Sequence, residues 1–393
     1  MTEWHRLFHA YGQATDAPKF LEALPRNDII EIDDDRGWQF DGIPYVFIWS
    51  GLYCQGRLTP ATAAAAHVIA GQISEPGFGA RDMTLRPGML FFFREIGRTA
   101  LAAQDVVDLR AKAARCDEPA AQAWLDAFLA APVPVFDWGD AQEPGGPFLA
   151  AAMIACYDLI PELFHVAVRF LTDTSGHTRR VAAMATATLV GHPDLVSRRP
   201  ALVDYHLREA AAEEDPYHRA SLVIGIGELG EQPQRWLRDP HPGVRICAAM
   251  APALANDPRA VAVLLRAARQ PTAFNTVFGT MHMPQLGHSH SVALIEALCQ
   301  RVRDFDLLAD GAIAALNIED RRALEPYLRV AFIDGLPEAD ASTPAQRRFA
   351  QTAASRDELW STGMTAWHAA LASVGLPTDR NSWAAVGTER PDN

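Results

Sequence analysis

The amino-acid sequence predicts an all-α fold built from stacked pairs of amphipathic helices. Three features carry this prediction: apolar residues recur at three- and four-residue spacing, alanine runs favour close helix packing, and turn residues separate short helical stretches. The clearest helix pair runs from Leu237 to Arg269. Repetition of such pairs is typical of a solenoid, in which each pair buries its apolar face against the next.

The first helix of this pair is expected from about Val244, after a proline-rich turn over 239–243. Pro252 falls within this helix and is expected to kink it. Asp257 is a candidate N-cap of the second helix, with Pro258 at its first position. Residues with strong conformational preferences therefore delimit both helices.

One pattern in the first helix resembles the HEAT repeat. The HEAT pattern D-x-x-P-x-V-R-x-x-A-x-x-A-L is matched, with a register offset of about one residue near Pro252, by Asp239, Pro242, Val244, Arg245, Ala248, Ala251 and Leu254. The resemblance implies a right-handed α-α superhelix, that is, a HEAT-like repeat solenoid with an armadillo-like fold.

The arginine of this pattern recurs as Arg180, Arg219 and Arg245, at intervals of 39 and 26 residues. A HEAT unit has about 40 residues, so the second interval implies a shortened partner helix at 232–237. The resemblance also implies that this arginine bonds an acid or a carbonyl group of the neighbouring repeat. We therefore expect Arg245 to join one repeat to the next.

Two stretches near the N-terminus carry a second resemblance. LFHAYGQATDAPKFLEAL at 7–24 and IWSGLYCQGRLTPATAAAAHVIAGQI at 48–73 resemble the opening of large HEAT-repeat families of actinomycetes. These families generally have no assigned activity. The resemblance therefore implies a fold and a source rather than a function.

Composition shifts divide the chain into parts. We expect a helical N-terminal part, a Pro/Gly-rich connection, an array of repeats and a polar, frayed tail, at 1–131, 132–147, 148–376 and 377–393. Variable loops are expected at 27–44 and, interrupting the repeats, at 272–290. Helical spacing predicts individual helices that include 45–55, 148–160, 161–171, 305–315 and 359–374.

The chain is acidic, with a net charge of −13 from 48 acidic and 35 basic residues. Such a surface repels the phosphate backbone, which disfavours nucleic acid as a partner, and it suits a basic protein partner or merely solubility. No apolar run reaches the roughly 20 residues that cross a bilayer, and the N-terminus lacks a secretory signal. We therefore expect a cytoplasmic protein without a membrane partner.

The loop at 272–290 contains three candidate site residues, His282, His288 and His290. Imidazoles are zinc ligands, but this spacing fixes no geometry and no carboxylate cluster accompanies it. We favour a plain insertion packed over the helices, then a loop that faces a partner or ligand, and last a metal site, and we predict no cofactor. If the loop serves binding, deleting 278–288 should leave thermal stability nearly unchanged.

Four further candidates lie in two places. Asp137 and Trp138 belong to the Pro/Gly-rich connection, and loops of that length are often functional. Glu214 and Asp215 form an acidic patch with Glu213 at the start of a helix. Carboxylates there more often offset the helix dipole than perform acid–base chemistry.

The favoured function is a binding or scaffold protein that holds a protein, peptide or ligand on the concave face of the solenoid. One alternative is an immunity-type or regulatory inhibitor of a basic toxin or nuclease. Another is a natural-product biosynthetic enzyme or lyase, which would need a closed apolar cavity of about 300–1,000 Å³. A HEAT-like DNA glycosylase is disfavoured because the chain lacks a basic excess. No catalytic residue is assigned.

Overall fold

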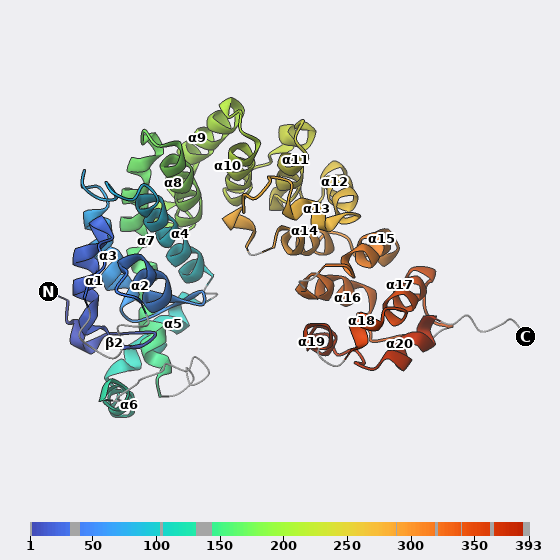
Figure 1. Ribbon diagram of the computed structural model, residues 1–393, viewed down its shortest axis with the longest axis horizontal. Coiled ribbons are helices and arrows are strands. Elements are labelled where there is room, and N and C mark those ends of the chain that lie inside the picture. Colours follow the sequence, from blue (N-terminus) through green and yellow to red (C-terminus); the bar gives the residue numbers. More distant parts are fainter. Residues whose placement is uncertain are drawn as a thin grey trace, which may run out of the picture. The chain divides into compact units, whose positions relative to one another are not determined.

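The structure is a computed structural model that describes residues 2–31, 40–102, 105–130, 144–287, 289–318, 321–338, 340–361 and 365–387. Over these ranges the chain forms α-helices α1 to α20, joined by short 3-10 segments, and two small antiparallel hairpins (Figure 1). The predicted all-α class is therefore confirmed. The chain divides into two compact units, Met1–Asp204 and Tyr205–Asn393.

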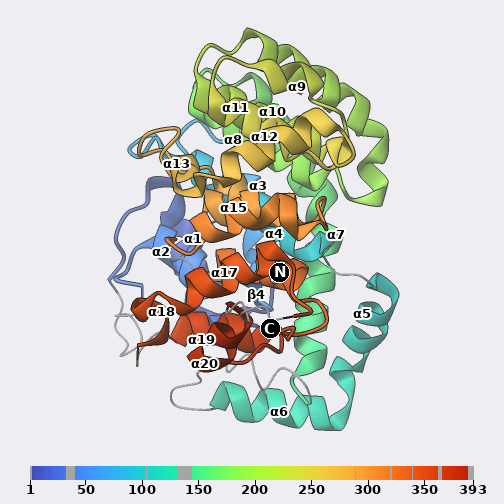
Figure 2. The same cartoon turned by 90° about the vertical axis from the view of Figure 1, so that its right-hand side faces the viewer.

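The first unit is organised around its longest helix, α7 (Gly146–Val168), which packs against α3, α4, α5 and α8 (Figure 2). The remaining helices that start in this unit are α1 (Ala17–Ala23), α2 (Pro44–Phe47), α3 (Thr62–Gln72), α4 (Leu85–Leu101), α5 (Val106–Ala113), α6 (Pro119–Ala130), α8 (Gly176–Leu189) and α9 (Arg199–Ala212). Helix α9 runs across the boundary with the second unit.

Helix α7 corrects the predicted pair at 148–160 and 161–171, because it continues through Pro161. Proline removes one helical hydrogen bond and crowds the preceding turn. The buried side chains of Ile160, Leu163 and Phe164 hold both sides of that position in the core, so packing overrides the local preference.

The stretch Gly146–Thr172, which includes α7, is long and apolar enough to cross a membrane by length and composition alone. It therefore qualifies the expectation that the chain contains no such stretch. The core helix of a globular unit passes the same test, and α7 packs against four helices. The length and composition of this stretch assign no membrane role.

The segment predicted as one helix at 45–55 is instead a short helix, a π-helical turn and a hairpin. After α2 the π-helical turn covers Ile48–Leu52, and strand β3 (Tyr53–Cys54) pairs with β4 (Arg57–Leu58). The connecting Gln55 and Gly56 have φ angles of 52° and 81°. A two-residue turn with both φ angles positive matches the twist of a hairpin, which ends the helical course. The other hairpin joins β1 (Phe8–His9) and β2 (Gly12–Gln13).

The second unit consists of helices whose contacts form two rows. Helices α12, α15, α17 and α20 contact one another in succession, as do α14, α16 and α19 (Figure 1). Their bounds are α10 (Pro216–Glu228), α11 (Pro242–Ala249), α12 (Pro258–Ala268), α13 (Pro271–Asn275), α14 (His290–Cys299), α15 (Phe305–Ala315), α16 (Glu325–Ala331), α17 (Pro344–Ala354), α18 (Asp357–Trp360), α19 (Thr365–Ser373) and α20 (Arg380–Gly387). Stacked helix pairs are what the sequence predicts, while the HEAT identity and the superhelical course stay predictions.

The second helix of the pair predicted within Leu237–Arg269 is confirmed, and it corresponds to α12. Asp257 caps α12 by accepting a hydrogen bond from the Arg259 backbone N–H at 2.8 Å, and Pro258 is the first helical residue. The first member is shorter than expected, since α11 ends at Ala249. Pro252 therefore terminates the helix rather than kinking it, because a residue before proline avoids the helical conformation and Ala251 is extended.

A recurring arginine closes the turn that precedes its own helix. In each case Nη1 donates to the two backbone carbonyls six and five residues earlier, over 2.6 to 3.3 Å. The three residues are Arg179, Arg219 and Arg245. The equivalent position in α8 is therefore Arg179 rather than the predicted Arg180, which contacts the His177 ring at 3.0 Å.

This arginine also corrects the expected link between repeats. Arg245 contacts carbonyls of its own preceding turn, Asp239 and Pro240. Only Arg219 reaches the turn of the next helix, where its guanidinium pairs with the Asp239 carboxylate at 2.9 and 3.3 Å. Both side chains of this pair are largely buried.

The C-terminal region differs from its prediction in two places. The helix predicted at 359–374 is two helices, because Ser361 is extended and ends α18. Part of the tail that was expected to be polar and frayed forms α20. Trp383 in α20 is fully buried and donates its indole N–H to the Pro377 carbonyl at 2.9 Å, so apolar burial fixes this segment. Residues 388–393 lie outside the described ranges.

The repeated arginine yields a stability prediction. Arg179→Ala should lower the free energy of unfolding by about 1.5–3 kcal/mol, because two charge-assisted hydrogen bonds are lost and two carbonyls lose their donor. The neighbouring Arg180→Ala should cost less, about 0.5–1 kcal/mol, because the two turn carbonyls keep their donor, Arg179. Urea unfolding followed by circular dichroism compares the two, and equal losses would contradict the assignment of the repeated position.

Candidate functional site

Three of the residues proposed from the sequence, Asp137, Trp138 and His288, lie outside the described ranges. The other four are Glu214, Asp215, His282 and His290. All four belong to the second unit, where they lie around the first turns of α10 and α11 and the loop that follows α13.

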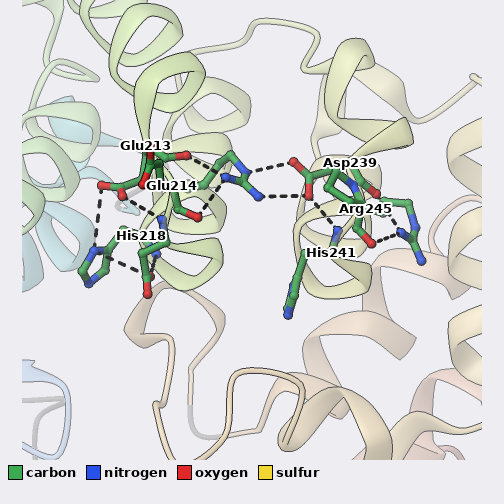
Figure 3. Close-up of polar contacts among 9 residues, drawn as sticks. Glu213, Glu214, His218, Asp239, His241 and Arg245 are labelled. Atoms are coloured by element: carbon green, nitrogen blue, oxygen red, sulfur yellow. Dashed lines mark hydrogen bonds and ion pairs between the residues drawn. The ribbon is translucent and has the colours of Figure 1, made fainter.

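Glu213 and Glu214 lie in the turn that precedes α10 (Figure 3), and Asp215 follows them as the N-cap residue. The Asp215 carboxylate caps the helix by accepting from the His218 N–H at 2.9 Å, and Glu213 accepts from the Asp215 N–H at 2.9 Å. The Glu214 carbonyl accepts from Arg219 at 3.3 Å. The carboxylates of Asp215 and Glu213 therefore bond backbone N–H groups at the start of α10, which is the structural role that the position of the patch at a turn favours.

The loop after α13 is fastened to α10 by two polar contacts. Tyr217 donates its hydroxyl to the His282 carbonyl at 2.8 Å. Gln285 donates its amide to the Ser221 hydroxyl at 2.9 Å and to the Ser221 carbonyl at 3.1 Å. The loop thus follows the surface of α10 at two separate points.

The same loop inserts apolar groups against α11. Met283 is fully buried, and its sulfur lies 4.0 Å from the Cys247 sulfur. Phe278 stacks on the His241 ring at 5.2 Å between centroids. This is the insertion packed over the helices that the sequence favoured. Deleting 278–288 would remove these contacts, so we expect a loss of stability rather than the neutrality that a free binding loop would give.

The backbone of α11 is shaped to receive Phe278. A Cβ atom on Gly243 would lie only 2.4 Å from the Phe278 Cζ atom, which is closer than atoms can approach. The glycine in the proline-rich turn at 239–243 therefore serves the packing of a side chain 35 positions further along the chain. The sequence around Gly243 contains no pattern that predicts this contact with Phe278.

His290, the first residue of α14, connects the start of the loop with its middle. Its Nε2 accepts from the Met283 backbone N–H at 2.9 Å, so its Nδ1 carries the proton and donates to the Phe274 carbonyl at 3.2 Å. The ring is buried and stacks on His282 at 4.8 Å between centroids. Burial lowers the pKa of His290 and outweighs the carbonyl, which raises it, while nearby His282 lowers it further. His290 is therefore a neutral structural bridge with both ring nitrogens engaged.

This arrangement leaves His290 without a nitrogen that could bind a metal ion. A ligating imidazole needs a free lone pair, and the only one on His290 is taken by Met283. Over the residues that the structure describes, no three His, Cys, Asp or Glu side chains gather closely enough to hold a metal ion.

A surface pocket of about 220 Å³ lies beside this loop, between α11, α12 and α13. Its walls are mostly apolar and include Pro242, Ile246, Val263, Ala273, Phe274 and Val277. Two arginines line it, Arg245 from α11 and Arg266 from α12, together with Gln270. Because the Phe274 carbonyl is held by His290, the loop described above fixes one wall of the pocket.

The two arginines of the pocket differ in their contacts. Arg245 is anchored through Nη1 to the Asp239 and Pro240 carbonyls at 2.7 and 2.9 Å. Arg266 is exposed in the last turn of α12, and within the described part of the chain it has no ion pair. No acidic side chain lines the pocket. Sequence reasoning missed this site, because its walls come from three elements and the loop residues were assigned to an interruption of the array.

Two buried polar groups in the first unit offer no rival site. His9 donates Nε2–H to the Asp16 carboxylate at 3.1 Å and accepts the Tyr11 N–H at its Nδ1, so it has no lone pair left for a general base. On α4 the Glu95 carboxylate accepts from Arg94 at 2.6 Å and from Arg98 at 2.8 Å. Both groups are engaged within the protein.

Comparison of the chain with protein-family models, with curated proteins and with solved structures finds no match. The candidate site therefore has to be interpreted from its own geometry.

The contact between Gly243 and Phe278 predicts that the effect of Gly243→Ala on stability depends on whether Phe278 is present. Gly243→Ala should cost about 1–3 kcal/mol of stability, because the added methyl group displaces the Phe278 ring. In a Phe278→Ala background the same substitution should be neutral or stabilising by up to about 1 kcal/mol, since alanine is the better helix former. Urea unfolding of the four proteins measures this coupling, and an equal cost in both backgrounds would show that Phe278 does not set it.

The buried His290 yields a pH prediction. Its folded-state pKa lies below the ordinary value, so the unfolded chain takes up the proton first. The stability that the neutral ring provides is complete above about pH 6.5 and is lost as the pH falls from there toward the lower folded-state pKa. His290→Gln keeps an amide that can bond both neighbours and should flatten the decline in unfolding free energy between pH 7 and pH 5. The exposed His5→Gln is the control, and an unchanged slope in His290→Gln would refute the bridge as its source.

Proposed function

We propose that this chain is a binding protein of the helical-repeat, HEAT-like type and that the pocket beside α11, α12 and α13 receives a side chain of a protein or peptide partner. The observation that carries the proposal is the pocket itself, a mostly apolar hollow of about 220 Å³ at the surface of the second unit. Exposed Arg266 and Gln270 form part of its lining.

The size of the pocket favours one side chain over a whole small molecule. Pockets for drug-sized ligands and cofactors usually measure about 300–1,000 Å³. A cavity of about 150 Å³ can hold benzene, so this pocket can hold an aliphatic or aromatic side chain. Protein partners bind in this way, with a few apolar anchors in pockets that supply most of the affinity.

The lining favours recognition over catalysis. It contains no serine, cysteine, histidine or carboxylate, and these are the groups that act as nucleophiles and general acids or bases. The biosynthetic enzyme considered from the sequence therefore has no support at this site. The inhibitor of a basic toxin is also disfavoured here, because the pocket presents arginines rather than acids.

The pocket is held in shape by the protein itself. Phe274 forms one wall and is fully packed, and its carbonyl is bonded by buried His290. On α11, Arg245 is fixed by two carbonyls of its own turn. A pocket that needs little rearrangement loses less affinity on binding, which supports a recognition role.

Filling the pocket provides the test. Peptides are selected on the full chain from an unbiased displayed library, and their affinities for variants are measured by fluorescence polarisation. Val263→Trp places a large ring in the pocket and should weaken binding at least about tenfold, the loss of one anchor. Ala262→Trp adds the same ring on the exposed side of α12 and should have little effect.

Thermal unfolding of both variants confirms that they fold. Failure to select any peptide, or selected peptides that bind Val263→Trp as well as the original chain, would refute the proposal.

A further inference from the structure

The charge of the pocket identifies the chemistry of its occupant. We infer that the partner is an acidic peptide, in which an apolar side chain fills the pocket and a neighbouring carboxylate pairs with Arg266 and Arg245. This inference rests on the proposed function and adds the class of partner to it.

The pocket is positive within an acidic protein. The chain has a net charge of −13, yet the pocket is lined by two arginines and by no acid. A guanidinium group bonds a carboxylate through paired N–H donors, which gives both attraction and orientation. At distances shorter than about 8 Å, local charges act with little screening, so these arginines decide what the pocket attracts.

Neither arginine is neutralised by a carboxylate of the described chain. Arg245 uses Nη1 for the two turn carbonyls, which orients the group and leaves its Nε and Nη2 donors for an acceptor in the pocket. Arg266 has no ion pair within the described ranges. The guanidinium group of Arg245 is therefore held in place before a partner binds, whereas the exposed side chain of Arg266 can adjust to the partner.

The acids near these arginines in the sequence are engaged elsewhere. The Asp239 carboxylate pairs with Arg219 at 2.9 Å and accepts the His241 N–H at 2.8 Å. Asp257 caps α12 and pairs with Arg259 at 2.7 Å. These carboxylates are held by their own partners, so an external carboxylate is the group that completes the pocket.

An acidic peptide fits better than a nucleic acid or another polyanion. A polyanion meets the net charge of −13 of the whole chain, which disfavours it at long range. The mostly apolar walls also require a hydrocarbon or aromatic group beside the charge. A peptide with one apolar anchor and one or two neighbouring carboxylates satisfies both conditions.

Four fluorescein-labelled peptides test the inference on the full chain. They are fluorescein-Glu-Glu-Phe-Glu-Glu-amide, labelled at its N-terminus, and its relatives with glutamine flanks, with lysine flanks, or with alanine in place of phenylalanine. We expect the glutamate-flanked peptide to bind about tenfold more tightly than the glutamine-flanked one, and the lysine-flanked and alanine peptides to bind more weakly still.

Charge reversal in the pocket adds a rescue experiment. Arg266→Glu should abolish the preference for glutamate and shift it toward the lysine-flanked peptide. Arg303→Glu reverses an exposed arginine of the same unit away from the pocket and should preserve the original order. Arg266 makes no ion pair in the described chain, so thermal unfolding should be almost unchanged.

The outcomes separate the inference from the proposed function. If peptides bind in a manner blocked by Val263→Trp but without a preference for glutamate or an effect of Arg266→Glu, the pocket binds peptides and the acidic partner is wrong. If Val263→Trp blocks none of the binding, including that of library-selected peptides, both fail together. If a phosphoserine-flanked peptide or single-stranded DNA binds more tightly through Arg266, the carboxylate assignment is overturned in favour of phosphate.

Discussion

The hydrogen bonds between a helical arginine and its preceding turn underlie both the fold and the site. At Arg179, Arg219 and Arg245 the guanidinium satisfies two backbone carbonyls that lie just before a helix. These carbonyls lie in the turn before the helix and are not part of its backbone hydrogen-bond ladder. Each needs a donor, and the arginine side chain reaches back from the helix to supply it. Arg245 also lines the pocket, so the contact that braces the turn holds one residue of the pocket wall in place.

The loop after α13 is also held in place by contacts between residues that are distant in the sequence, and it fixes one wall of the pocket. His290 bonds the start and the middle of the loop, and Gly243 leaves room for the ring of Phe278. Each of these contacts joins positions that are distant in the sequence. The loop is therefore an integral part of the second unit, and the segment predicted to interrupt the repeats supplies the Phe274 wall.

Local patterns in the sequence predicted local structure well and long-range structure poorly. The all-α class, the helix at 305–315 and the cap at Asp257 depend on periodicity and on capping chemistry within a few residues, and the structure confirms them. Pro161 was misjudged because the packing of α7 in the core overrides the cost of a proline. Arg180 was chosen over Arg179 because two adjacent arginines match one pattern, and only contacts in space distinguish them.

The pocket shows why net charge is a poor guide to a binding site. The overall charge of −13 suits a basic partner or merely solubility, because it describes the long-range field of the whole chain. Three acids of the second unit, Asp215, Asp239 and Asp257, are engaged as caps or ion pairs, so their charge is offset within the fold. A partner in contact with the pocket meets only the charges that are not neutralised within the protein. In this pocket those charges are the positive guanidinium groups of Arg245 and Arg266. The net charge of the chain acts at long range, whereas the two arginines of the lining act on the group that enters the pocket.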